Sequence, residues 1–439
     1  MSYHKTRCER YSSGMRPPLL GVQAANPERC PALLESSAQH PSAGRYDILL
    51  AGAGETIVGS PFLRTLEACW QRERKGRDDH ALPFGGGWFV YLGYELASEI
   101  EPALNLPHTS APAAFAQRVH GAAIYDHQDE TTWLIAEAGH EALIDELATA
   151  LGAARDPVES TAQTLASLEE ESADLFLSGV ATVKAHIAAG DVYQVNLSRA
   201  WRGRLARDIS PAALYARLRR ANPSPFGGIA HLPWMSVLST SPERLIECRD
   251  GQVQTRPIAG THPRLGDDAQ VTAALRAHPK ERAEHVMLLD LERSDLGRIA
   301  EAGSVVVDEY AIVETYAHVH HLVSNVRARI RAEVSPIDVI RAVFPGGTIT
   351  GCPKIRCMQI IAALEGQARG AYTGSMGYLG LDGSLDLNIL IRTATLDADE
   401  VRFRTGAGIV ADSDATRELE ETRAKARGLL RGFGRDVDK

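Results

Sequence analysis

The chain has 439 residues, 44% of them hydrophobic and 23% charged, which is the composition of an ordinary globular protein. Its 47 basic and 56 acidic side chains give a net charge of −9. This balance argues against a general nucleic-acid or membrane-surface role, since both usually need a basic face. The beginning of the chain lacks the apolar core of a secretory signal, no apolar run approaches the ~18 residues of a membrane-spanning helix, and six scattered cysteines show no metal-ligand spacing. We therefore expect a cytoplasmic protein with reduced thiols that binds neither nucleic acid nor membranes.

Composition divides the chain into three expected regions. Residues 1–27 are expected to form an irregular N-terminal arm. In residues 28–160 short strand-like runs alternate with glycine turns, which indicates an N-terminal subdomain. Residues 161–439 are expected to form a C-terminal subdomain that carries the site. The polar, acidic stretch 155–174 at the boundary is interpreted as a linker or an exposed helix.

The first elements of the C-terminal region are a helix and a strand. Apolar positions at helical spacing in LFLSGVATVKAHIAAG predict a helix that stops at Gly190. The next stretch, DVYQVNLSRAWRGRL, alternates like a strand, with Val192, Val195 and Leu197 as its candidate buried positions.

Three more helices are expected farther along the chain, at 279–300, 353–365 and about 415–433. A proline at the start of the first fits a helix N-terminus, and residues 412–414 offer a cap for the last.

The segment SLDLNILIRTATL is the clearest strand pattern in the chain. It places Leu385, Leu387, Ile389 and Ile391 on one face and Arg392 on the opposite face. Strands and helices are mixed without a regular βαβ alternation, so we predict an α+β fold with largely antiparallel sheets.

Two pairs of carboxylates stand near predicted helix starts. Glu281 and Glu284 are three residues apart, as are Glu418 and Glu421, with Lys425 one turn later. Residues at this spacing share one helix face. Each pair is either a solvated face that compensates the helix dipole or part of a site for a hard cation such as Mg²⁺.

Other candidate residues are isolated in the sequence. Arg392 needs a carboxylate partner, which is either internal or part of a ligand. Gly406 and Gly408 in TGAGIV either present amides to a carboxylate or form a plain strand bend. His321 lies in an apolar context typical of a core histidine. Glu243 in STSPERLIE suits proton transfer if it is buried.

The ordered set of motifs SPERL, RPIAGT, ERAEHVMLLDLERSDLGR, HHLVS, FPGGTITGCPK, GYLG, LDLNILIRT, GAGIVADSD and EETRAKA resembles the chorismate-utilising enzymes. This family includes component I of anthranilate synthase and of aminodeoxychorismate synthase, with isochorismate and salicylate synthases as relatives. The resemblance covers about residues 28–435. It implies a fold of two packed, mostly antiparallel sheets with helices on the outside.

The resemblance also implies a role for each candidate residue. Glu284 and Glu421 would hold Mg²⁺, with Glu281 and Glu418 in support. Glu243 would be the general acid that protonates the departing C4 hydroxyl of chorismate. The residues implied to bind the substrate carboxylates and enolpyruvyl tail or to line the ring are Tyr372, Arg392, Gly406, Ala407, Gly408, Lys425, Thr348 and His321.

A second implied site lies near the N-terminus. The segment CPALLESS resembles the tryptophan-binding segment of anthranilate synthases, and Leu34, Glu35 and Ser36 match it. A plain strand is the alternative interpretation.

Ala259 bears on which reaction the family resemblance implies. Aminodeoxychorismate and isochorismate-type enzymes often carry a lysine at this position, whereas anthranilate synthases typically carry alanine. A methyl group can neither attack nor accept a proton. The stretches GWFVYLGYELASEIEP, NPSPFGG, AHVHHLVS and FPGGTITG are nevertheless more similar to aminodeoxychorismate synthases. We therefore expect amination of chorismate at C4 for folate biosynthesis, with anthranilate formation as the alternative, and in both cases ammonia from a separate glutaminase subunit.

Overall fold

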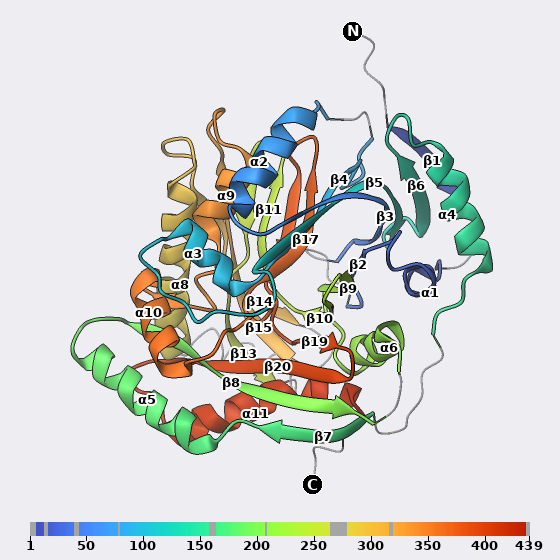
Figure 1. The fold of residues 1–439 in the computed structure, drawn as a ribbon. Helices are drawn as coiled ribbons and strands as arrows, with labels where there is room; N and C mark the ends of the chain where they lie inside the picture. The colour runs from blue at the N-terminus through green and yellow to red at the C-terminus, as the bar shows by residue number, and fades with distance from the viewer. Residues whose placement is uncertain are drawn as a thin grey trace.

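A computed structural model describes residues 6–12, 16–38, 44–77, 80–157, 164–206, 209–263, 279–315 and 319–435. Figure 1 shows helices around the periphery of an interior made largely of strands. The helices are α1 (Leu19–Ala25), α2 (Phe62–Glu73), the 3-10 helix η1 (Tyr94–Leu96), α3 (Ala97–Ile100), α4 (Ala142–Ala153), α5 (Ala173–Ala188), α6 (Pro211–Ala221), α8 (Pro279–Gly297), α9 (Pro336–Val343), α10 (Lys354–Glu365) and α11 (Ala415–Gly432).

The strands are β1 (Arg7–Tyr11), β2 (Ala32–Glu35), β3 (Tyr46–Val58), β4 (Gly87–Leu92), β5 (Ala114–Asp126), β6 (Thr131–Ala136), β7 (Leu165–Glu170), β8 (Gln194–Leu205), β9 (Phe226–Leu232), β10 (Met235–Ser241), β11 (Arg244–Arg249), β12 (Gln252–Thr255), β13 (Ile258–Pro263), β14 (Val306–Thr315), β15 (Val319–Arg329), β16 (Gly351–Cys352), β17 (Ser375–Gly380), β18 (Leu385–Asn388), β19 (Thr393–Asp397) and β20 (Glu400–Ile409).

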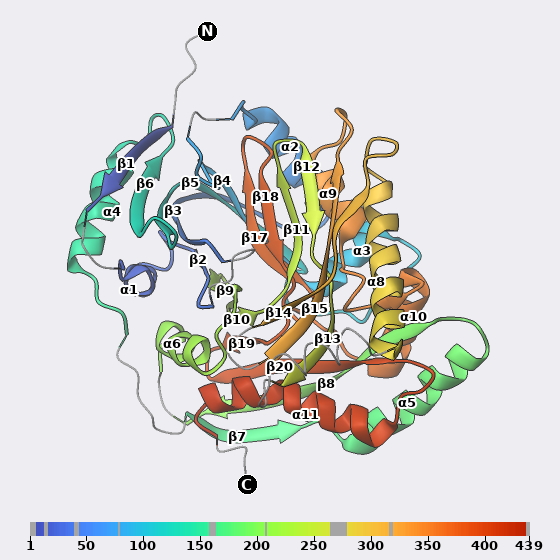
Figure 2. The same cartoon turned by 180° about the vertical axis from the view of Figure 1, so that it is seen from behind.

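All strands of the described chain belong to one hydrogen-bonded network, and the pairings between them are antiparallel. Two runs of neighbouring strands meet at β5, one through β4 toward β17, β18, β11 and β12, and one through β3 toward β2, β9, β10, β19, β20 and β8 (Figure 2). The α+β class with a large antiparallel sheet is therefore confirmed. The expected division into two packed sheets is not shown, because β5 joins the two runs.

The N-terminal part of the chain is more regular than its composition predicts. The region expected to be an irregular arm contains β1, which pairs with β6, and the buried helix α1. The stretch expected to be a linker or helix contains β7, which pairs with β8. Pairings β2–β9 and β4–β17 connect residues on both sides of position 160. The division into subdomains at that position remains a prediction.

The predicted elements around the site form as expected. Helix α5 ends at Ala188, two residues before Gly190, and β8 follows with Val195 and Leu197 buried. Helix α8 begins at Pro279, and α11 is capped by the Asp414 side chain, which accepts a 3.0 Å hydrogen bond from the Arg417 N–H. In the described part of the chain no helix is long and apolar enough to cross a membrane.

The clearest strand of the sequence is interrupted, and this is a correction to the prediction. Leu385, Leu387 and Ile389 are buried in the largest core cluster as predicted, but β18 ends at Asn388 and β19 begins at Thr393. Arg392 lies in the break with φ 52°, in the left-handed region that non-glycine residues rarely adopt. Instead, the Leu390 C=O accepts a 2.9 Å hydrogen bond from the Thr373 N–H, and the Leu390 N–H donates a 2.8 Å hydrogen bond to the Gly374 C=O. These tertiary hydrogen bonds replace the strand pairing.

Candidate active site

Strand β20 forms the base of the candidate site. It pairs with β8 along residues 400–409, whereas its pairing with β19 ends at Phe403. Lys425 donates a 3.0 Å hydrogen bond to the C=O of Gly406. The N–H and C=O of one residue in an antiparallel strand point to the same side, so this bond indicates that Gly406, and Gly408 two residues on, face the unpaired edge. Of the two interpretations made from sequence, a strand whose open edge offers amides to an anion is the one the geometry favours.

Tyr372 approaches this strand at a position where only glycine fits. A Cβ on Gly406 would lie 2.6 Å from the Tyr372 hydroxyl and 2.6 Å from the Asn196 side-chain oxygen. The Tyr372 hydroxyl and the Asn196 side chain are themselves hydrogen-bonded. Burial raises the pKa of Tyr372, so the phenol stays protonated and can donate.

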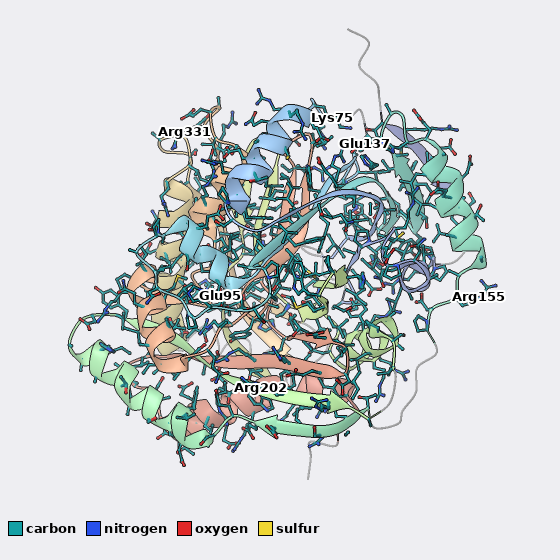
Figure 3. All side chains as sticks on the ribbon, viewed as in Figure 1. Lys75, Glu95, Glu137, Arg155, Arg202 and Arg331 are labelled. Atoms are coloured by element: carbon teal, nitrogen blue, oxygen red, sulfur yellow. The ribbon has the colours of Figure 1, made fainter. Side chains whose placement is uncertain are left out.

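The turn that carries Tyr372 is held by buried charges. Glu95, labelled in Figure 3, accepts backbone hydrogen bonds from Arg369 (2.7 Å) and Gly370 (3.1 Å). The Arg369 guanidinium bonds Glu365 at 2.6 Å and lies 5.4 Å from the centre of the Tyr372 ring. This network fixes the ring from behind, so the hydroxyl is the part that faces Gly406.

Arg392 supplies an uncommitted positive charge beside Tyr372. The pKa of its guanidinium is lowered by burial, and the charges that act against this are those of Tyr372 and Glu421. Its guanidinium makes no hydrogen bond or ion pair with the residues that the structure describes. The internal carboxylate partner considered from sequence is therefore not found among the described residues, and a ligand carboxylate remains as the partner that fits.

The candidate metal ligands come from two helices that reach the same strand. Glu284 of α8 accepts a 3.0 Å hydrogen bond from Gln194, and its Oε1 would lie 3.6 Å from a Cβ on Gly408. Glu421 of α11 forms a 2.6 Å ion pair with Lys425, the residue that bonds Gly406. Glu418 is buried on the first turn of α11, and the side chain of Glu281 lies outside the described set.

The acidic side chains near this strand are candidate ligands for Mg²⁺. Among the described side chains no group of three or more His, Cys, Asp or Glu residues could hold a metal ion. Mg²⁺, however, is usually bound by one or two carboxylates and fills its other positions with water and substrate oxygens. Glu284 and Glu421 offer such oxygen donors, and the buried Oε1 of Gln194 beside Glu284 has no hydrogen-bond partner among the described residues. The donor set fits Mg²⁺.

Glu243 has the properties of a general acid. It lies between β10 and β11, is 6% exposed, and accepts hydrogen bonds from the Thr348 hydroxyl (2.8 Å) and the Ile258 N–H. Burial raises the pKa of Glu243 to about 7, although both hydrogen bonds and the nearby Lys425 charge act in the opposite direction. A carboxyl with such a pKa holds a proton near neutral pH and can donate it. Lys425 interacts with Glu243 and also bonds Gly406 of β20, so Glu243 and this strand belong to one site.

Ala259 and His321 lie on paired strands. The backbone of Ala259 in β13 pairs with Leu322 of β15, and the buried His321 pairs with Thr261. The side chain of Ala259 is outside the described set. The roles of both residues remain predictions.

The segment that resembles a tryptophan site borders a separate cavity. Leu34 and Glu35 line a cavity of about 310 Å³, whose lining does not include Ser36 or any candidate catalytic residue. The Glu35 carboxylate accepts hydrogen bonds from Arg16 (2.9 Å), Arg219 (2.5 Å) and Tyr215 (3.0 Å). Tryptophan binding remains a prediction, and Glu35 is already committed to three donors.

Sequence reasoning missed several residues that shape the site. Asn196 and Gln194 of β8 contact Tyr372 and Glu284, and their alternating spacing in DVYQVNLS was the available signal. Glu292 of α8 is 4% exposed and accepts a hydrogen bond from the Gly347 N–H. No local pattern marks Glu292, because it follows the spacing of an ordinary helix.

Comparison with known proteins identifies the family. The model of the chorismate binding enzymes matches residues 30–431, and the chain belongs to this family. It is 39% identical over 435 residues to aminodeoxychorismate synthase component 1 of Bacillus subtilis, covering 91% of each chain. It is also 39% identical over 421 residues to an anthranilate synthase component I-like protein of Synechocystis, covering 91% of this chain and 85% of that protein. The crystal structure of anthranilate synthase component I from Streptococcus pneumoniae is similar at a TM-score of 0.80 and 30% identity, covering 89% of this chain and 93% of that chain.

Proposed function

We propose that this protein aminates chorismate at C4 to form 4-amino-4-deoxychorismate, with ammonia delivered by a separate glutaminase subunit. The observation that carries the proposal is the buried acid Glu243, which holds a proton near neutral pH and faces Lys425. In the same site Arg392 has no ion-pair partner among the described residues. Chorismate offers what this arrangement needs, since it has two carboxylates and a hydroxyl that leaves only after protonation.

The binding groups match the charges of the substrate. Arg392 would bind one carboxylate through its planar fork, and the Gly406 and Gly408 amides would donate to carboxylate oxygens. Lys425 would turn from Glu421 and the Gly406 carbonyl toward the enolpyruvyl tail. The Tyr372 hydroxyl lies next to Gly406 and would donate a hydrogen bond to the bound substrate, while Thr348 and His321 would line the substrate ring. Mg²⁺, when bound by Glu284 and Glu421 with Glu281 and Glu418 in support, would neutralise the ring carboxylate.

Glu243 would carry the proton that allows substitution. Its carboxyl donates the proton to the C4 hydroxyl, the C4–O bond breaks, and water leaves. The nitrogen of ammonia forms the new C–N bond, and the resulting ammonium loses a proton to solvent. Ala259 has no nucleophile or base to offer, so ammonia would reach C4 directly or water would take the place of a lysine.

Formation of anthranilate is the second candidate, favoured by Ala259. In that reaction ammonia adds at C2, Glu243 again protonates the departing C4 hydroxyl, and pyruvate is then lost. The relatives described above carry names from both branches. We favour amination at C4 because the motifs NPSPFGG, AHVHHLVS and FPGGTITG, spread along the chain, are more similar to aminodeoxychorismate synthases.

Ammonia is proposed to come from another chain. The Bacillus subtilis relative is named as a component 1, which indicates a partner component. With purified protein alone, free ammonium should support turnover and glutamine should not.

The deciding experiment is the identity of the product. Purified protein is incubated with chorismate, Mg²⁺ and ammonium, and the products are separated with fluorescence and mass detection. An aminated chorismate that yields p-aminobenzoate only after a lyase is added supports the proposal. Fluorescent anthranilate with free pyruvate would replace it with the second candidate.

A further inference from the structure

A second buried carboxyl lies behind the general acid. Glu292 projects from α8 onto the turn that begins at Gly347, and the Gly347 N–H donates a hydrogen bond to its carboxylate. The approach is close: a Cβ on Gly347 would lie 3.1 Å from Glu292 Oε1 and 2.5 Å from the Leu291 side chain. Position 347 therefore requires glycine for Glu292 to reach the backbone.

The next residue of the same turn contacts Glu243. Thr348 donates its 2.8 Å hydrogen bond to Glu243 Oε1. The turn is closed by hydrogen bonds from the N–H groups of Thr350 (3.2 Å) and Gly351 (3.1 Å) to the Gly347 carbonyl. Two consecutive residues of one rigid turn thus bind two different carboxyls, one behind the site and one within it.

Few charged groups of the described chain face the carboxyls of Glu292 and Glu243. Glu292 is faced by Asp295 of its own helix and by Lys354 of α10, which bonds Asp295 at 2.5 Å and the Val343 carbonyl at 3.1 Å. Burial raises the pKa of Glu292 to about 8, with the charges of Asp295 and Glu243 acting in the same direction. Glu243 is faced by Lys425 and the Ile258 N–H.

We propose that Glu292 is a positioning residue for the reaction: it holds the Gly347–Thr348 turn against Glu243, so that Thr348 keeps the general acid in one orientation. This inference rests on the proposed role of Glu243 but not on which carbon is aminated. The effect acts through the turn and not through charge, because Glu292, with a pKa of about 8 against about 7 for Glu243, keeps its proton while Glu243 ionises. A side chain at position 292 that still accepts the hydrogen bond from the Gly347 N–H should therefore preserve the general acid.

The test compares three variants by kcat and KM for chorismate consumption with ammonium and Mg²⁺. Glu292→Gln keeps an acceptor for the Gly347 N–H and removes the ionisable group. We expect kcat and KM near those of the parent protein for this variant, because the hydrogen bond that holds the turn is kept. Glu292→Leu removes the acceptor as well, so we expect about a tenfold loss of kcat with little change in KM. Asp290→Asn, an exposed position on the same helix that pairs with Arg293, is the matched control and should match the parent protein.

Three results would overturn the inference. One is a kcat for Glu292→Leu equal to that of the parent protein. The second is a loss in Glu292→Leu that parallels a fall in melting temperature, since this would indicate a structural role alone. The third comes from the carboxyl C=O stretch of Glu243, identified by infrared difference against Glu243→Gln, which reports its hydrogen bond from Thr348 without turnover. This stretch should shift in Glu292→Leu but not in Glu292→Gln, and an unshifted stretch in Glu292→Leu would count against this inference. An absence of turnover in the parent protein would count against the proposed function instead.

Discussion

The Thr348 hydroxyl lies 2.8 Å from Oε1 of Glu243 and donates a hydrogen bond to it. This bond and the hydrogen bond from the Ile258 N–H together fix the orientation of the carboxyl. A hydrogen bond to the carboxylate normally lowers its pKa, yet burial outweighs it here and raises the pKa of Glu243 to about 7. The acid is therefore held in a fixed orientation and still keeps its proton near neutral pH.

Replacement of this acid should slow the chemical step. We expect Glu243→Gln to lower kcat by about 10²- to 10⁴-fold, the usual contribution of a general acid, with chorismate affinity largely kept. In the parent protein, activity should fall as pH rises through the pKa of Glu243, because only the protonated form donates. Steady-state rates together with binding calorimetry measure both effects, and an unchanged kcat in the variant would exclude Glu243 as the acid.

The same group makes stability depend on pH in a defined direction. The pKa of Glu243 is about 7 in the folded chain, above its ordinary value of 4.5, so the folded state binds this proton more tightly. Its stabilising contribution is fully present below pH 4.5 and is lost as pH rises through 7. We expect Glu243→Gln to raise the melting temperature relative to the parent protein at about pH 8 and to do so much less at about pH 5. An equal difference at both pH values in scanning calorimetry would contradict this account.

Sequence predicted the elements of the site better than their junctions. Helices α8, α10 and α11 and strand β8 follow from periodicity, proline and cap residues, which act locally. The left-handed conformation of Arg392 does not, because it depends on hydrogen bonds between the segment at Leu390 and the distant turn at 373–374. The role of Glu292 cannot be predicted from sequence for a similar reason, since only tertiary packing brings its partner Gly347 to it. Local patterns fix elements, whereas the contacts that tune the chemistry join segments far apart in the chain.

Arg392 should act in binding rather than in folding. We expect Arg392→Ala to weaken chorismate binding about 10- to 100-fold, as for loss of a hydrogen bond to a charged group worth ~1.5–3 kcal/mol. The melting temperature should not fall, because Arg392 has no ion pair with the described residues and its desolvated charge is costly in the free protein. Arg204→Ala, which removes an exposed ion pair between Arg204 of β8 and Asp399, is the control and should bind chorismate normally. Calorimetry that gave equal affinity for Arg392→Ala and the parent protein would remove Arg392 from the substrate site.

The glycine at 406 should be required for the position of Tyr372. A Cβ there would lie 2.6 Å from the Tyr372 hydroxyl, so in Gly406→Ala the tyrosine or the strand must shift. We expect KM to rise at least tenfold, since a displacement of this size misplaces a binding donor. Gly297→Ala at the end of α8, where a Cβ meets no atom within 4 Å, is the matched control. Normal KM in Gly406→Ala would show that Tyr372 does not contact the substrate.

A lysine at position 259 tests what the alanine has replaced. Ala259 lies on β13, paired with Leu322, in the motif where aminodeoxychorismate and isochorismate-type enzymes often carry a lysine. If the site keeps the geometry of those enzymes, Ala259→Lys should form a covalent adduct with the substrate when ammonium is withheld. Intact-protein mass spectrometry would detect the added mass, and Ala259→Met, of similar length but without an amine, should give none. Failure of the lysine variant to form an adduct would count against a conserved lysine geometry.

The carboxylates of α8 and α11 should control metal dependence. Chelation of divalent cations should abolish turnover, and added Mg²⁺ should restore it. We expect Glu284→Gln to weaken activation by Mg²⁺ strongly, because the charge of a carboxylate dominates binding of a hard cation. Glu421→Gln should do the same and should also free Lys425 from its 2.6 Å ion pair, so that its effect on chorismate binding differs from that of Glu284→Gln. Glu420→Gln is the matched control, since Glu420 precedes Glu421 on α11, is exposed and bonds Arg423. Mg²⁺ titrations of initial rate and of chorismate affinity separate these cases, and identical Mg²⁺ dependence in Glu284→Gln, Glu421→Gln and Glu420→Gln would exclude a metal site between the two helices.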